Sequence, residues 1–144
     1  METKRFSLVK PTLDTPFHID FLWWKQHDTS WRVFLQGYLC PHHQLTLGNL
    51  NLEETIDWID AETAEVQPVD GLQHILITHC ARQEGFLTDH TTMVDAVFRI
   101  FLANGNAPLS PNELGTLLKR PPETILRTLA GIQVYKGIRP CTSS

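Results

Sequence analysis

Helix start and stop signals between Leu109 and Pro140 constrain the fold more tightly than any other part of the chain. Ser110 is typical of an N-cap, because its hydroxyl can accept a hydrogen bond from a first-turn amide. Pro111 suits the first helical position, and Glu113 stands where its carboxylate can bond back to the cap amide. Together these residues predict a short helix that begins after Ser110 and ends near Leu118.

A second short helix follows a break imposed by two consecutive prolines, Pro121 and Pro122. Proline cannot donate a backbone hydrogen bond, and it disfavours helical geometry in the residue before it. The second helix is therefore predicted from Glu123 to Ala130, with Gly131 as its stop. Apolar residues recur in both helices at three- and four-residue spacing, which predicts one core-facing side each. The expected core positions are Leu114, Leu117 and Leu118 in the first helix and Ile125, Leu126 and Leu129 in the second.

A longer helix is predicted before this pair, from Thr92 to Ala103. Thr92 and Asp95 can form a capping box at its start, and Asn104-Gly105 supplies a stop that favours left-handed geometry. Its apolar residues fall on one side at helical spacing, so we expect this helix to pack under the other two. The apolar side consists of Val94, Val97, Phe98, Phe101 and Leu102.

The tail after the last helix, Val134 to Arg139, is short and basic, with Lys136-Gly137 where a turn is expected. Three helices, a tight turn and such a tail resemble a winged helix-turn-helix domain. The resemblance implies that the last helix is a recognition helix, that the tail is a minimal wing, and that the partner is duplex DNA. It also implies a role in transcription regulation. The same fold serves in protein contacts, so a non-catalytic interaction adaptor, or a subunit of a larger assembly, remains the alternative.

The resemblance assigns DNA contacts to individual side chains. Arg127 could donate two hydrogen bonds to a guanine, and Thr124 and Thr128 would face the same groove. Lys119 and Arg120, in the turn between the helices, would bind phosphates. The complete set of expected DNA contacts is Lys119, Arg120, Thr124, Arg127, Thr128, Lys136 and Arg139.

Charge is distributed unevenly along the chain. Residues 1–87 carry twelve acidic residues and six Lys or Arg, a balance of −6, whereas residues 88–144 carry four and six, a balance of +2. The net charge of −4 therefore conceals a basic C-terminal part, which is what a phosphate-binding surface requires. A solvated surface of mixed charge is the alternative.

The segment from Phe17 to Cys40 is rich in aromatic residues. Apolar residues alternate with polar ones around Phe17-Ile19-Phe21 and again around Trp31-Val33-Leu35, which predicts two strands of a β-hairpin. The residues His27 to Ser30 would form its turn. The part from Phe17 to Lys25 also fits helical spacing, and this alternative stays open.

An acidic stretch from Leu50 to Asp70 carries seven acidic residues and no basic one. A short helix beginning at Asn51 is predicted there, followed by a turn and a short strand. The next helix is predicted to begin after Asp70-Gly71 and to end near Gly85. It is also a candidate contact surface for a homodimer. Its apolar side consists of Leu72, Ile75, Leu76, His79 and Cys80.

Cysteine and histidine residues form a candidate metal site. The sequence Cys40-Pro41-His42-His43 offers two ligands within one tight turn, and zinc requires four in a tetrahedron. Cys80 is the natural third ligand, and the fourth stays open among four residues. A structural zinc is the candidate cofactor, with an iron–sulfur cluster on the three cysteines, or reduced thiols and histidines of an ordinary core, as the alternatives. The candidates for the fourth position are His79, His42, His74 and Cys141, and the predicted set is Cys40, His43, His79 and Cys80.

Several classes of protein are disfavoured by the sequence. No apolar run reaches the roughly 20 residues that span a bilayer, and the N-terminus lacks the pattern of a secretory signal. We therefore expect a cytoplasmic protein with no membrane partner. Three cysteines do not suggest a disulfide framework. No nucleotide-binding fingerprint and no oriented nucleophile is recognisable, so we do not expect an enzyme.

These patterns together predict a predominantly helical α+β protein. An N-terminal aromatic β-element and a helix would pack on a C-terminal winged-helix domain. We place the boundary after residue 87, so that residues 1–87 hold the metal knuckle and residues 88–144 hold the helix-turn-helix.

Overall fold

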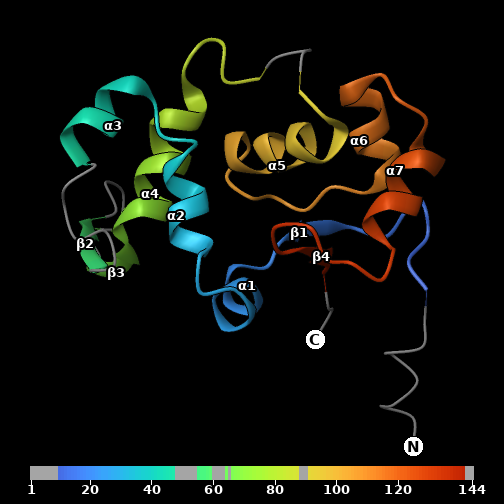
Figure 1. Cartoon of the computed structure of the whole chain (residues 1–144), viewed down its shortest axis with the longest axis horizontal. Coiled ribbons are helices and arrows are strands. Elements are labelled where there is room, and N and C mark those ends of the chain that lie inside the picture. The colour runs from blue at the N-terminus through green and yellow to red at the C-terminus, as the bar shows by residue number, and fades with distance from the viewer. Residues whose placement is uncertain (1–9, 48–54, 60–63, 65, 88–90, 142–144) are drawn as a thin grey trace, which may run out of the picture.

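The computed structural model describes residues 10–47, 55–59, 64, 66–87 and 91–141. The protein belongs to the α+β class and is built mostly of helices, as predicted (Figure 1). Among the described residues, no helix is long and apolar enough to cross a membrane. The elements in chain order are β1 (Phe17–Ile19), α1 (Phe21–His27), α2 (Trp31–Gln36), α3 (Pro41–Leu47), β2 (Thr55–Ile59), β3 (Val66–Asp70), α4 (Gly71–Thr78), the 3-10 helix η2 (Cys80–Arg82), α5 (Met93–Ala103), α6 (Pro111–Leu118), α7 (Pro122–Leu129) and β4 (Ile138–Pro140).

Helix α5 lies at the centre of the fold. It begins where the hydroxyl of Thr92 accepts a hydrogen bond from the amide of Asp95, and its C-cap is Asn104, as the sequence predicts. It contacts α4, η2, α6 and β1. Figure 1 shows α2, α3 and α4 on one side of α5, and α6 and α7 on the other. The buried side chains of α5 are Val97, Phe98, Ile100, Phe101 and Leu102.

A small sheet joins distant parts of the chain. Strand β1 pairs antiparallel with β4, with Phe17 opposite Pro140 and Ile19 opposite Ile138. Phe17 also forms a bridge to Leu109, just before α6. The predicted turn at Lys136-Gly137 does form, with φ of 52° and 75°. The strand that follows it pairs with β1, however, whereas the strand of a wing hairpin would pair with the segment before the turn.

One hydrophobic cluster draws residues from both parts of the sequence. Phe17, Leu72, Phe98 and Ile125 all belong to it and have no exposed surface. Burial of this apolar area supplies the main favourable free energy of folding. The cluster contains residues from both sides of position 87 in the sequence. The domain boundary placed after residue 87 stays a prediction.

The start signals of α6 are confirmed in detail. The hydroxyl of Ser110 accepts a hydrogen bond from the amide of Glu113, and the carboxylate of Glu113 accepts one from the amide of Ser110. Helix α6 then ends at a C-cap, Lys119, whose φ of 58° lies in the left-handed region. Helix α7 begins at Pro122, within one residue of the predicted start.

The contact between α6 and α7 depends on a glycine. Gly115 lies where α6 meets the start of α7, and a Cβ atom added there would stand 2.8 Å from the carbonyl oxygen of Arg120. A larger residue therefore does not fit without a shift of the backbone.

Leu117, which the sequence places in the core, is 58% exposed, so that prediction is wrong. It lies beside a cavity between α5 and α6 instead of under a packed neighbour.

The predicted β-hairpin over Phe17 to Cys40 is wrong. Strand β1 ends at Ile19, and α1 and α2 follow it. The carboxylate of Asp20 accepts a hydrogen bond from the amide of Trp23 at 3.0 Å and so caps α1. Phe21 and Trp24, three residues apart, then bury on one helical face. The helical alternative is therefore correct from Phe21 onward.

The helix predicted from Asn51 is wrong where the structure describes that segment. Strand β2 occupies Thr55–Ile59 and pairs antiparallel with β3, and residues 51–54 lie outside the described residues. The short strand predicted after that helix and a turn corresponds to β3. Asp70 then caps α4, as expected, but α4 ends at Thr78 and not near Gly85.

Candidate metal centre and helix-turn-helix surface

Cys40 and His43 come together because a helix starts between them. Cys40 immediately precedes α3, and its carbonyl oxygen accepts a hydrogen bond from the amide of Gln44 at 2.9 Å. Residues three positions apart lie on the same side of a helical turn. The Sγ atom of Cys40 is consequently 3.2 Å from Nδ1 of His43.

Cys80 reaches the same point from the other side. Its Sγ atom lies 3.5 Å from Sγ of Cys40 and 3.3 Å from Nδ1 of His43. Cys80 is the first residue of η2, and its side chain is buried. Helix α4 ends just before, at Thr78, and the φ of −129° and ψ of −64° of its C-cap, His79, depart from helical geometry. This break differs from the continuous helix that the sequence predicts through both residues.

His79 completes the group, as predicted. Its ring centroid lies 4.6 Å from that of His43, with the two planes 83° apart. One possible ligand atom each from Cys40, His43 and His79 lie within 4.8 Å of one another, so this cluster could hold a metal ion. Cys80 lies against two of the three. The four residues that the sequence selects therefore meet at one place.

The distances within the cluster are close to those of a tetrahedral zinc site. Zn–S bonds of about 2.3 Å and Zn–N bonds of about 2.0 to 2.1 Å place two sulfurs about 3.8 Å apart and a sulfur and a nitrogen about 3.6 Å apart. The corresponding separations here are 3.5 Å between the two sulfurs and 3.2 and 3.3 Å from the sulfurs to His43. For these three side chains, adjustments of a few tenths of an ångström reach the tetrahedral separations.

The other residues considered as ligands, His42, His74 and Cys141, do not belong to the group that could hold a metal ion among the described residues. His42 is exposed and contacts His43 only edge to face, at 5.2 Å between ring centroids. The amide of Cys141 donates to the carbonyl oxygen of Pro16, on the sheet side of the molecule. Burial and the charge of Asp20 raise the pKa of the Cys141 thiol. Cys141 is therefore a thiol in a different environment.

The surroundings of the cluster favour the neutral forms of Cys80 and His43. Burial, and the nearby thiol of Cys40, raise the pKa of Cys80 to about 11. Burial, with the neighbouring rings of His79 and His42, lowers the pKa of His43. The imidazole of His43 is thus kept neutral, which is the form that ligates metals. A divalent cation would reverse the penalty on the Cys80 thiolate, because a coordinating thiol is deprotonated.

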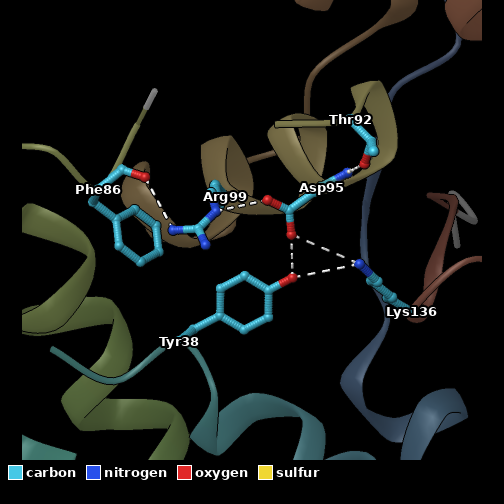
Figure 2. Close-up of polar contacts among 6 residues, drawn as sticks. All are labelled: Tyr38, Phe86, Thr92, Asp95, Arg99 and Lys136. Carbon is cyan, nitrogen blue, oxygen red and sulfur yellow. Dashed lines mark hydrogen bonds and ion pairs between the residues drawn. The ribbon is translucent and has the colours of Figure 1, made fainter. Parts of the chain in front are cut away.

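A polar network connects the segment before Cys40 to the C-terminal turn (Figure 2). The hydroxyl of Tyr38 donates a hydrogen bond to the carboxylate of Asp95, on α5. Arg99 donates to the same carboxylate at 2.8 Å and to the carbonyl oxygen of Phe86 at 3.1 Å. Lys136 lies 3.8 Å from Asp95 and 3.4 Å from the hydroxyl of Tyr38. The network therefore fixes α5 against both neighbours.

The network shifts the pKa values of its members. Burial, followed by the hydrogen bond and charge of Asp95, raises the pKa of Tyr38 far above its usual value. Burial alone would raise the pKa of Asp95, but Tyr38, Arg99 and Lys136 together hold it below its usual value. Burial also lowers the pKa of Lys136, against the opposing charge of Asp95.

Two of the cations expected at a wing have internal partners. Lys136 stands over the ring of Phe34 at 4.5 Å in addition to its contacts in the network. Arg139 forms an ion pair with Asp20 at 3.1 Å and stands over the ring of Trp23 at 5.1 Å. Both charges hold β4 and its turn against the N-terminal helices.

The cations of α6 and α7 are placed differently. Lys119, Arg120 and Arg127 are all exposed. Within the part of the chain that the structure describes, none of the three takes part in an ion pair. Thr124 and Thr128 are half-buried on α7, and the Thr128 hydroxyl donates to the carbonyl oxygen of Thr124 at 3.0 Å.

Comparison of the chain with protein-family models, with curated proteins and with solved structures finds no match. Its sites are therefore interpreted from its own residues.

One feature beside α6 was not foreseen. A second row of α5 residues lines a cavity of about 590 Å³ between α5 and α6. The sequence does contain a signal for it, because these residues recur at helical spacing next to the core-facing row. The row consists of Met93, Ala96, Ile100 and Ala103.

Proposed function

We propose that the protein binds duplex DNA through the surface formed by α6, α7 and the turn between them, in a role in transcription regulation. One observation carries the proposal. Lys119, Arg120 and Arg127 are exposed and have no ion-pair partner among the described residues, whereas Arg99 and Arg139 are neutralised by Asp95 and Asp20. Exposed, uncompensated cations on neighbouring elements are what attract a phosphate backbone.

Each cation has a distinct role in this proposal. Arg127 lies on α7, the candidate recognition helix, and its planar guanidinium suits bidentate contact with a guanine. Lys119 and Arg120 lie in the turn and would bind phosphates, which fix the register of the protein on the duplex. Thr124 and Thr128 flank Arg127 on the same helix and would contact the backbone or a thymine methyl group.

The order of the elements supports the same interpretation. Helices α5, α6 and α7, the bridge at Leu109 and the turn before β4 follow one another as in the winged helix-turn-helix domains that the sequence resembles. The pairing of β4 with β1 departs from a separate wing. Phosphate contacts are accordingly assigned to the turn between α6 and α7, and Lys136 and Arg139 to stabilising β4.

We also propose that Cys40, His43, His79 and Cys80 hold a structural zinc ion. Two thiolates and two imidazoles form a complete tetrahedral set, which is typical of structural rather than catalytic zinc. The ion would join the start of α3 to the end of α4. An iron–sulfur cluster is less well supported, because Cys141 lies on the sheet side of the molecule and the cluster offers two cysteines.

Binding to a labelled duplex, measured by fluorescence anisotropy at low salt, tests the DNA proposal. We expect Arg127→Ala and Arg120→Ala each to weaken binding by about 1 to 3 kcal/mol without loss of folding. Lys25→Ala is the matched control, since Lys25 is an exposed cation on α1, away from α6 and α7. If no duplex is bound at low salt, the DNA proposal is wrong, and the adaptor alternative takes its place.

A further inference from the structure

The cavity between α5 and α6 is mainly apolar. Its walls come from the second row of α5, from the end of α6 and from two residues that flank the segment 88–90. A volume of about 590 Å³ is within the range of small-molecule sites in proteins. The lining residues are Leu87, Thr91, Met93, Ala96, Arg99, Ile100, Ala103, Asn104, Leu117, Leu118, Lys119 and Arg120.

Two exposed leucines border this cavity. Leu87 is 53% exposed and Leu117 is 58% exposed, and both belong to its lining. Exposed leucines are unremarkable when scattered, but here both face the same concave apolar surface. An apolar ligand that filled the cavity would remove their side chains, together with Met93 and Ala103, from water.

The charged part of the lining is positive. Among the described lining residues, the charged side chains are Arg99, Lys119 and Arg120, and none is acidic. Arg99 is already bound to Asp95 and to the carbonyl oxygen of Phe86. Lys119 and Arg120, which have no ion pair in the described part of the chain, therefore remain to bind an anionic group at the end of α6.

We propose that this cavity binds a free amphipathic carboxylate, an unbranched acyl chain with its carboxylate on Lys119 and Arg120. The chain would lie along the second row of α5. This row runs from Met93 to Ala103, about 15 Å at the rise of an α-helix. An extended chain advances about 1.2 Å per bond, so the row accommodates a chain of up to roughly twelve bonds. Decanoate, whose extended chain is shorter than the row, is therefore the probe of choice.

Binding of the carboxylate would oppose binding of DNA. Lys119 and Arg120 are the two side chains assigned above to phosphate. They cannot neutralise the carboxylate of the ligand and a DNA phosphate at the same time. This coupling rests on the proposed function, whereas binding of the carboxylate itself does not. Ligand binding is therefore measured first, without DNA.

Isothermal titration of the whole protein with decanoate, below its micelle concentration, tests the proposal. We expect saturable binding of one molecule per chain. Ala103→Phe fills the cavity and should abolish binding, while Ala107→Phe, at an exposed position outside the lining, should not. The double variant Lys119→Ala/Arg120→Ala should weaken decanoate binding at least tenfold and leave binding of decanol unchanged. Circular dichroism and the melting temperature check that each variant is folded.

Four results would overturn the proposal. Decanoate is excluded as a ligand if the wild-type protein shows no saturable heat, or if folded Ala103→Phe binds it as tightly as the wild type. Equal weakening of decanoate and decanol by the double variant would remove the carboxylate from the proposal. Sedimentation with vesicles that contain anionic phospholipid distinguishes a free ligand from a membrane surface. Binding to the vesicles without binding of free decanoate would contradict a soluble ligand.

The coupling is tested separately. Decanoate should raise the apparent Kd of the wild-type protein for the labelled duplex, and it should have no such effect on Ala103→Phe. If the protein binds decanoate but no duplex, the carboxylate site stands and the proposed function fails. If it binds the duplex but not decanoate, the reverse holds.

Discussion

The Sγ atoms of Cys40 and Cys80 lie 3.5 Å apart, although 40 positions separate the two residues in the chain. Both thiols are free, and His43 stands 3.2 and 3.3 Å from them. Two buried or half-buried thiols beside an imidazole gain little from one another unless they share a ligand, because thiols are weak hydrogen-bond donors and acceptors. The tetrahedral zinc ion that we propose would account for their arrangement.

Replacement of one thiol should release the metal. We expect the wild-type protein to carry about one zinc ion per chain, since four ligands form one closed site. Cys40→Ser and Cys80→Ser should each lower zinc affinity more than about a hundredfold, because even the partners that only orient zinc ligands contribute up to that factor. Elemental analysis of protein purified without added zinc gives the content, and thermal melting gives the stability.

Cys141→Ser is the matched control for this measurement. Cys141 is half-buried like Cys40, but its amide donates to the carbonyl oxygen of Pro16 on the sheet side of the molecule. We expect it to keep both the zinc and the melting temperature of the wild type. Wild-type protein without any bound metal, or equal loss from all three variants, would contradict the assignment of the ligands.

Gly115 should not tolerate a larger side chain. The Cβ atom of Gly115→Ala would lie 2.8 Å from the carbonyl oxygen of Arg120 and 2.9 Å from Cγ of Pro122, so the turn between α6 and α7 must shift. We expect the free energy of unfolding to fall by about 1 to 3 kcal/mol. Urea denaturation monitored by circular dichroism measures it.

Gly131→Ala provides the comparison for that variant. Its nearest atoms to an added Cβ are carbonyl oxygens at 3.6 and 3.7 Å, which is ordinary contact. The substitution should be neutral or stabilising by up to about 1 kcal/mol, since alanine restricts the unfolded chain. An equal loss of stability in both variants would show that the close approach at Gly115 is not the cause.

The carboxylate of Asp95 should make stability depend on pH in the acid range. Tyr38, Arg99 and Lys136 hold the pKa of Asp95 below its usual value despite burial. A lowered pKa in the folded state gives stability that is fully present above the unfolded pKa of about 3.9 and is lost as the pH falls through the folded value. The contribution of Asp95 is therefore complete at neutral pH.

Asp95→Asn tests this dependence. At pH 7 it should lower the free energy of unfolding by about 1 to 3 kcal/mol, as expected for hydrogen bonds to a charged group. The difference from the wild type should shrink when the pH falls below about 4. Denaturation of both proteins at the two pH values measures it, and loss of metal in acid affects both alike. A difference that is constant with pH would contradict the role of the charge.

Helices α6 and α7 could be predicted well because their signals are local. The capping box at Ser110 and the proline break at Pro122 depend on neighbours in the sequence and leave few alternatives. The prediction of an N-terminal hairpin was wrong because the aromatic residues fit both the spacing of a strand and the spacing of a helix. The cap at Asp20, a single hydrogen bond to the amide of Trp23, decided between them.

The candidate metal site was accessible from sequence for a similar reason. The pair Cys40 and His43 is set by one helical turn, whereas the approach of Cys80 depends on packing of α4 that the apolar pattern only suggests. The Tyr38–Asp95–Lys136 network had no such signal. Its members are separated by 57 and 98 positions, and only the folded chain brings them together.

The salt dependence of duplex binding tests the proposed function most directly. Three phosphate or base contacts by Lys119, Arg120 and Arg127 correspond to a slope of about −2 to −3 in a plot of log K against log salt, between about 50 and 200 mM. Removal of Lys119 should make that slope less steep by about 1, with Lys25→Ala as the control. Absence of duplex binding at about 50 mM salt, or a slope that Lys119→Ala leaves unchanged, would contradict a DNA-binding surface on α6 and α7.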